Sequence, residues 1–172
     1  MYETNNSHSF CNMSEFVRPT VEEVKARLME TVVGQTANIP KTANKGLVGS
    51  WLETKTGIPT SSACLDCVDG ELKLFPIKPK TARSKATCPF TAAETIAITM
   101  VDFEKLKTQS FEESRVYKKL ENTLFMPHYR YDAENIRFYE PVHMRREHPA
   151  MAQLKADYET IQAAVLRGEP LS

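Results

Sequence analysis

Hydrophobic residues recur at helical spacing in three stretches of the chain. The first follows a capping box formed by Thr20 and Glu23 and predicts a helix over 20–34. The second predicts a helix over 44–56, and the third predicts a helix over 149–167. Each pattern ends at or directly before a glycine, a residue that commonly terminates helices.

Shorter apolar runs predict β-strands between these helices. Asp69 and Gly70 form a dipeptide typical of tight hairpin turns, and they separate two of the runs. Ser110 and Glu113 have the spacing of a second capping box, which predicts a short helix that reaches Lys119. The expected strands are 65–68, 71–77, 95–101, 123–126 and, as an edge strand, 136–139. This order predicts an α/β or α+β fold, with a sheet flanked by helices.

The strand over 71–77 places polar residues on one of its faces. Side chains alternate across a strand, so Leu72 and Leu74 share the face that packs inward. Glu71 and Lys73 then share the opposite face, and Asp66 can reach it from the neighbouring strand of the expected hairpin. Two carboxylates and an ammonium group are therefore expected to meet at one edge of the sheet.

Carboxylates that converge in this way repel each other unless a positive charge neutralises them. Mg²⁺ is the usual ion, because it prefers oxygen ligands. A metal there can polarise a phosphodiester and lower the pKa of a bound water, while the lysine helps to orient that water. Glu-x-Lys is nevertheless a common tripeptide, and most examples lie on solvated strand faces. The motif needs support from the rest of the chain.

Charge and composition narrow the classes of partner. The chain has 22 Lys and Arg residues and 22 Asp and Glu residues, so any contact with DNA has to come from local basic patches. No apolar run approaches the roughly 18 residues of a membrane span, and no membrane partner is expected. The polar segment 1–15 lacks the features of a signal peptide and is expected to be flexible, ahead of a single domain over 16–172.

Two groups of residues are candidate ligand sites. Cys64 and Cys67 have the spacing of half a zinc site, but a second close pair is missing, so the cysteines are interpreted as reduced cytosolic thiols. The loop 78–89 is rich in basic residues and contains no acid, which suits a phosphate backbone. Arg130 belongs to a segment that is either a further contact patch or the exit of a strand. The expected DNA-binding residues are Lys78, Lys80, Arg83, Lys85 and Arg130.

The chain resembles the MutH family, which comprises a mismatch-repair nicking endonuclease and related restriction endonucleases that cut at GATC. The resemblance spans residues 19–168 and rests on motifs that occur in the same order. These motifs are "KGLVGSWLETKTG" (45–57), "LDCVDGELKLFPI" (65–77), "ETIAITMV" (94–101), "SRVYKKLENTLFMP" (114–127) and "LKADYETIQAAVLRG" (154–168). The resemblance implies a restriction-endonuclease-like central mixed sheet flanked by helices.

The resemblance also implies catalytic roles for particular residues. Glu53 matches the glutamate of the family's helix motif, Asp66 matches the metal-binding aspartate, and Glu71 and Lys73 match the Glu-x-Lys pair. Lys119 matches a further active-site lysine. Glu53, Asp66 and Glu71 would hold Mg²⁺, for which Mn²⁺ can substitute.

Several alternatives stay open at this point. Asp69 could be the metal ligand in place of Asp66, although Asp69 is better explained as part of a turn, and Lys118 competes with Lys119. Glu94 sits where the family has an acidic residue.

The resemblance implies a cytoplasmic enzyme that acts on double-stranded DNA, either as a homodimeric restriction enzyme or as a nickase activated by a repair partner. The rival readings are a non-cleaving DNA-binding module and a catalytic core that needs a partner for sequence recognition. The family continues past the last helix into a C-terminal arm that helps to read the DNA sequence. Because the chain stops at Ser172, we expect low sequence preference.

Overall fold

The computed structural model describes residues 17–42, 44, 46–81 and 88–169, so the expectation for residues 1–15 lies outside it. Its helices are α1 (Val21–Thr31), α2 (Leu47–Thr56), α3 (Phe103–Leu106), α4 (Arg115–Leu120) and α5 (Ala150–Leu166). Its strands are β1 (Thr36–Asn38), β2 (Glu71–Pro79), β3 (Phe90–Ala92), β4 (Asn122–Arg130), β5 (Asn135–Phe138) and β6 (Val142–Arg145). The three long helices predicted from the sequence are confirmed.

The strands form one mixed sheet in the order β1-β5-β4-β2-β3, and β6 pairs with the first half of β4. The two central strands, β2 and β4, run parallel, so that Glu71 lies opposite Thr123 and Lys73 lies opposite Phe125. The other strand pairs are antiparallel. The predicted mixed sheet with flanking helices is confirmed, and the start of β2 pairs with β4, while β3 pairs only with the end of β2.

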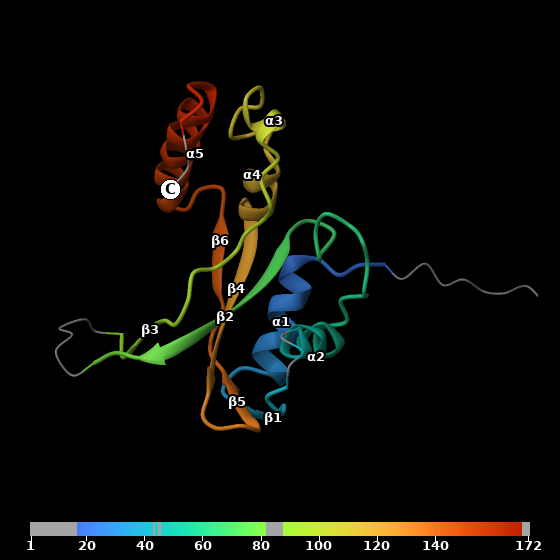
Figure 1. Ribbon diagram of the computed structural model, residues 1–172. Helices are drawn as coiled ribbons and strands as arrows, with labels where there is room; N and C mark the ends of the chain where they lie inside the picture. Colours follow the sequence, from blue (N-terminus) through green and yellow to red (C-terminus); the bar gives the residue numbers. More distant parts are fainter. Residues whose placement is uncertain (1–16, 43, 45, 82–87, 170–172) are drawn as a thin grey trace, which may run out of the picture.

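Helices α1 and α2 cover one face of this sheet (Figure 1). The capping box begins α1 as predicted, since Thr20 accepts a hydrogen bond from the backbone of Glu23 and the Glu23 side chain accepts one in return. Trp51 of α2 stacks on Phe138 of β5 with ring centroids 5.4 Å apart. The core beneath the two helices contains Val21, Val24, Leu28, Val32, Ile39, Leu52, Ile58, Cys67, Leu72, Leu124, Met126, Ile136 and Phe138.

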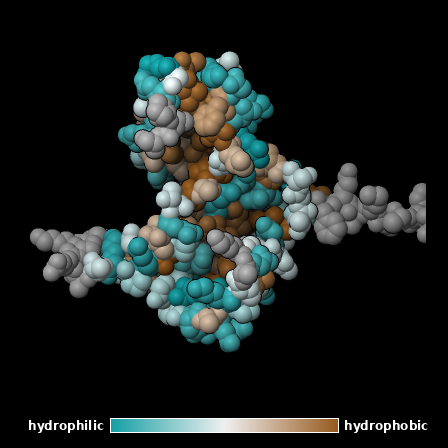
Figure 2. Space-filling model, viewed as in Figure 1, coloured by the Kyte–Doolittle hydropathy of each residue, from teal (hydrophilic) through white to brown (hydrophobic). Residues whose placement is uncertain are grey.

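A second apolar cluster joins α3, α4 and α5 to β6, at the upper end of the molecule in Figure 1. Its buried members are Leu106, Phe111, Leu120, Met144, Met151 and Tyr158. Phe125 of β4 packs against this cluster from the face of the sheet that α1 and α2 do not cover. Figure 2 shows apolar surface in this upper part, where Met100, Phe103 and Leu166 are exposed.

The predicted hairpin strand over 65–68 is wrong, because these residues form a series of bends before β2. The N–H of Cys67 donates to the carbonyl of Gly70, and the N–H of Val68 donates to the carbonyl of Pro19. Cys67 is fully buried in the core beneath α1. The apolar pattern of this segment therefore reflects the packing of a turn and not the face of a strand.

The predicted strand over 95–101 is also wrong, since these residues form no strand in the described part of the chain. Ile98 packs on the second cluster, while Met100 and Val101 stay exposed. The β-branched residues of this segment serve packing near α5 instead of strand pairing. Glu94, just before it, is exposed.

Other differences concern short elements and edges. Strand β5 is not an edge strand, because it lies between β1 and β4. The Ser110–Glu113 pair is present, but helix α4 begins later, with Ser114 as its N-cap. Elements β1, β3, β6 and α3 contain only three or four residues, too few for a periodic pattern to indicate them.

Gly70 allows the turn before β2 to pass against the start of β4. A Cβ atom at Gly70 would lie 2.0 Å from the backbone oxygen of Asn122 and 2.6 Å from the side chain of Val21. We therefore expect Gly70→Ala to destabilise the fold by about 3 kcal/mol or more, as overpacking against backbone does. Urea denaturation measures the change.

Gly49→Ala is the matched control, since a Cβ at Gly49 in helix α2 meets no atom within 4 Å. It should leave stability unchanged or raise it by up to about 1 kcal/mol, the usual gain in a helix interior. Equal stability of the two variants would contradict the packing described here.

Candidate active site

Glu71, the first residue of β2, is a buried carboxylate held between two lysines. Its side chain is 1% exposed, and its Oε1 atom lies 2.8 Å from Nζ of Lys73 and 2.5 Å from Nζ of Lys119. Lys73 shares the strand face of Glu71, as the alternation predicted, whereas Lys119 comes from the last turn of α4. A buried carboxylate requires such compensation. The two ammonium groups supply it.

Asp66 lies beside Glu71 in the bend before β2. Its N–H donates to Oε2 of Glu71 over 3.3 Å, and its own Oδ2 accepts from the N–H of Leu72 over 3.2 Å. Burial, and then the negative charge of Glu71, raise the pKa of the Asp66 carboxyl. The hydrogen bond from Leu72 and the charges of Lys73 and Lys119 act in the opposite direction. Asp66 thus reaches the polar end of β2 from a turn and not from a neighbouring strand.

Glu53, in helix α2, lies close enough to Asp66 for the charges of the two carboxylates to interact. Burial, and then the charge of Asp66, raise the pKa of the Glu53 carboxyl. The site therefore combines three carboxylates and two ammonium groups from α2, the bend, β2 and α4. These five residues are the ones for which the family resemblance implied catalytic roles.

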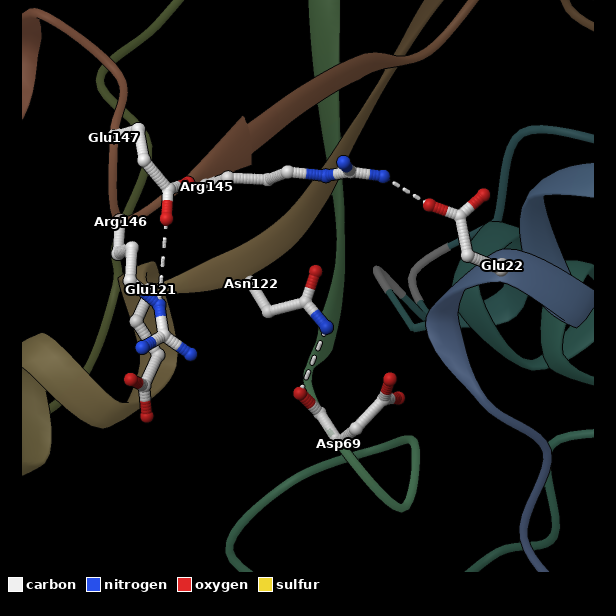
Figure 3. A pocket seen from close by; sticks show the side chains of 7 residues that line it. All are labelled: Glu22, Asp69, Glu121, Asn122, Arg145, Arg146 and Glu147. Carbon is white, nitrogen blue, oxygen red and sulfur yellow. Dashed lines mark hydrogen bonds and ion pairs between the residues drawn. The ribbon is translucent and has the colours of Figure 1, made fainter.

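Asp69 has a different environment from that of Asp66. Its Oδ1 accepts a hydrogen bond from the N–H of Val21 over 2.8 Å, at the start of α1. Figure 3 shows Asp69 in a separate polar pocket, where its backbone oxygen accepts from the Asn122 amide and Arg145 pairs with Glu22. The carboxylate of Asp69 thus holds the first turn of α1, while Asp66 contacts Glu71.

The adjacent residues Lys118 and Lys119 also have different environments. Lys119 is buried against Glu71, with 10% of its side chain exposed, whereas Lys118 is exposed. Sequence alone could not separate the two lysines. The contact with Glu71, which is 48 positions away in the chain, makes the difference.

The expected DNA-binding residues are dispersed. Lys78 is exposed on β2 and Lys80 follows that strand, where its N–H donates to the carbonyl of Pro89. Arg83 and Lys85 lie outside the described residues. The guanidinium of Arg130 donates from Nη1 to the carbonyls of Ile39, at 2.8 Å, and Ala133, at 3.2 Å. The role of these residues in DNA binding stays a prediction.

Among the described cysteines, the environment of Cys67 disfavours zinc binding. Burial raises the pKa of the Cys67 thiol to about 12, so it resists the ionisation that zinc binding requires. Cys64 and Cys88 are exposed and carry free thiols.

The carboxylates at the start of β2 fit a hard cation better. Glu53, Asp66 and Glu71 supply oxygen donors of the type that Mg²⁺ prefers. Burial and the neighbouring negative charges raise the pKa of both Glu53 and Asp66, and a bound cation would offset this repulsion. Within the described ranges, no three His, Cys, Asp or Glu side chains already stand at metal-binding distance. Glu71 instead directs Oε1 at the two lysines.

A mixed sheet with acidic residues and lysines gathered at the start of one central strand defines the class: a restriction-endonuclease-like fold. The family model described as DNA mismatch repair enzyme MutH matches residues 60–157, which is more than half of the chain. The chain belongs to the MutH family, and its class is that of DNA endonucleases of the MutH and restriction type. Comparison with individual curated proteins gives no match.

The matched range contains Asp66, Glu71, Lys73 and Lys119, whereas Glu53 lies before it. Within the described part of the chain, no helix has the length and apolar composition that a membrane crossing requires.

The sequence did not reveal that Asp69 caps α1. The Asp69-Gly70 dipeptide indicated only a turn.

Proposed function

We propose that this chain is a Mg²⁺-dependent endonuclease that hydrolyses phosphodiester bonds of double-stranded DNA. The observation that carries the proposal is the buried Glu71, which contacts Lys73, Lys119 and the backbone of Asp66. Isolated surface pairs of Glu and Lys contribute little and are not buried in this way. Membership of the MutH family supports the same activity.

Each residue has a separate part in this proposal. Asp66, Glu71 and Glu53 would hold the metal, which when bound would polarise the phosphodiester and lower the pKa of a bound water. Lys73 is 25% exposed, so its ammonium group reaches the solvent side of the site and can orient the attacking water. Lys119 is buried and fixes the orientation of the Glu71 carboxylate.

Basic residues beyond the catalytic end of β2 would position the DNA. Lys78 lies further along the same strand and Lys80 follows its end, and we propose that they contact phosphates with Arg83, Lys85 and Arg130. Cleavage of one strand would mark a repair nickase that acts with a partner protein. Cleavage of both strands would mark a homodimeric restriction enzyme.

Supercoiled plasmid provides the test of activity. Purified protein with Mg²⁺ should convert unmethylated plasmid to the nicked or the linear form, and parallel reactions with Dam-methylated plasmid report methyl sensitivity. A protein that binds the plasmid but leaves it intact with both Mg²⁺ and Mn²⁺ would instead be a non-cleaving DNA-binding module.

Asp66→Asn separates catalysis from folding. The amide keeps an oxygen that can accept from Leu72, but it removes a charge that burial and Glu71 disfavour. We expect cleavage to be lost while the thermal stability at pH 7 stays equal or rises. Because the raised pKa penalises only the ionised form, the gain should vanish near pH 3, below the usual aspartate value of 3.8. A variant that cleaves normally, or that melts well below the wild type at pH 7, would contradict the assignment.

Metal binding should appear as a change in stability. Mn²⁺ at a hundred times its Kd should stabilise the fold by about 2.7 kcal/mol, which thermal melts with and without DNA can detect. Asp66→Asn is the control and should show a smaller rise. Melting temperatures of the wild type that do not change with Mn²⁺ in either condition would count against the metal site.

A further inference from the structure

Four aromatic rings cluster on the sheet beyond the candidate active site. Phe90 of β3 lies 5.9 Å from the ring of Tyr129 and 5.1 Å from the ring of Tyr139, measured between centroids. Tyr131 packs edge-on against Tyr129 at 4.7 Å, and its hydroxyl lies 3.4 Å from that of Tyr139. The rings come from β3, from β4 and the residue after it, and from the residue after β5. We call these four residues the aromatic platform.

The aromatic platform lies on the same face of the sheet as Glu71 and Lys73. Lys73 is opposite Phe125, and Tyr129 lies four residues further along β4, so alternation puts both on one face. Phe138 and Met126, with the opposite parity, belong to the core beneath α1 and α2. Four residues of strand span about 13 Å, which is close to the rise of four stacked bases.

The aromatic platform is not closed off as an ordinary core would be. Tyr131 is 51% exposed, and helices α3 to α5 gather at the other end of the sheet in Figure 1. The guanidinium carbon of the exposed Arg137 lies 5.9 Å from the ring of Tyr139. Partly exposed aromatic rings can stack on a base, and a neighbouring guanidinium group can contact its phosphate.

We propose that the aromatic platform stacks an unpaired base of the DNA substrate. Within a duplex the faces of each base are covered by its neighbours, so a protein ring can stack only on a base at an end, in a bulge or turned out of the helix. This inference rests on the proposed function, since continuity with the catalytic face is what makes DNA the ligand. It adds that the enzyme prefers DNA with an unpaired base near the scissile phosphate.

Fluorescence anisotropy in EDTA measures the preference without cleavage. Three labelled DNAs of one sequence are compared: a fully paired duplex, a duplex with an unpaired bulge, and the same bulge built from abasic sites. The wild type should bind the bulged duplex about tenfold more tightly than the paired duplex, within the range of base–aromatic stacking. The abasic bulge keeps the phosphates and the flexibility, so it should bind like the paired duplex.

Tyr131→Ala and Tyr131→Phe are the matched variants, because Tyr131 is half exposed and Phe keeps the ring. Tyr131→Ala should lose the preference and Tyr131→Phe should keep it, with melting temperatures confirming that both fold. A preference that is absent in the wild type, survives abasic sites, or survives Tyr131→Ala would overturn the inference. Plasmid cleavage by the wild type reports on the proposed function separately, so cleavage without bulge preference would refute the aromatic platform alone.

Discussion

Lys73→Ala is expected to cleave DNA about 10³-fold more slowly than the wild type, an increase in barrier of about 4 kcal/mol. Nζ of Lys73 lies 2.8 Å from Glu71 and is the more exposed of the two ammonium groups at the site. Its charge can therefore act on water and phosphate at the surface of the site. Lys119 keeps Glu71 paired in the variant, so the fold should change little. Single-turnover cleavage at saturating protein gives the rate.

The matched variant for Lys73→Ala is Lys80→Ala, which removes a lysine beyond the end of β2. Lys80→Ala should weaken DNA binding at all sequences and flatten its dependence on salt, with a smaller effect on the saturated rate. Lys73→Ala should show the opposite pattern, with a lower rate and nearly unchanged affinity. Normal cleavage by Lys73→Ala would remove the basis of the proposed catalytic site.

Local sequence signals predicted the parts of the fold whose own pattern decides their structure. The Thr20–Glu23 capping box begins α1, and Gly57 ends α2 with a positive φ of 74°. Leu72 and Leu74 define the buried face of β2. In each of these elements the residues that determine the structure lie within a few positions of one another, so a single sequence is enough to reveal them.

Long-range contacts determine the structure of the segments that the sequence patterns predicted wrongly. Cys67 is buried because its bend packs beneath α1, and Ile98 is covered by the second apolar cluster, so neither residue indicates a strand. The same limit applies to the site. Lys119 meets Glu71 only because β2 and β4 run side by side and α4 leads into β4.

The candidate site could be assembled from the sequence only with the help of the family resemblance. Alternation along β2 places Glu71 and Lys73 together, but nothing in the spacing relates them to Glu53 or Lys119. The aromatic platform had a weaker signal, since Tyr129 and Tyr131 are two positions apart and so share a strand face. Its other two rings belong to Phe90 of β3 and to Tyr139, just after β5, and strand pairing brings them alongside.

Lys119→Met is expected to destabilise the fold by about 3 kcal/mol, the lower end of the usual cost of removing one partner from a buried ion pair, because Lys73 still pairs with Glu71. Glu71 is 1% exposed and Lys119 is 10% exposed, so water cannot replace the lost ammonium group without opening the end of β2. Lys73 keeps its contact with Glu71, which should prevent complete unfolding. Urea denaturation at neutral pH measures the loss. Lys118→Met changes the exposed neighbour and should stay within about 0.5 kcal/mol of the wild type.

The double variant Glu71→Gln with Lys119→Met tests whether the loss comes from the stranded charge. Glutamine is close in shape to glutamate and carries no charge that needs an ammonium partner, so most of the stability should return. Cleavage should stay absent, because the proposed metal ligand has been removed. The double-mutant cycle should then show a coupling energy between the two positions, in the range of about 0.5–3 kcal/mol seen for residues in one network. Simple addition of the two single losses would mean that Lys119 supports the fold by packing alone, and the buried ion pair would no longer explain why α4 ends against β2.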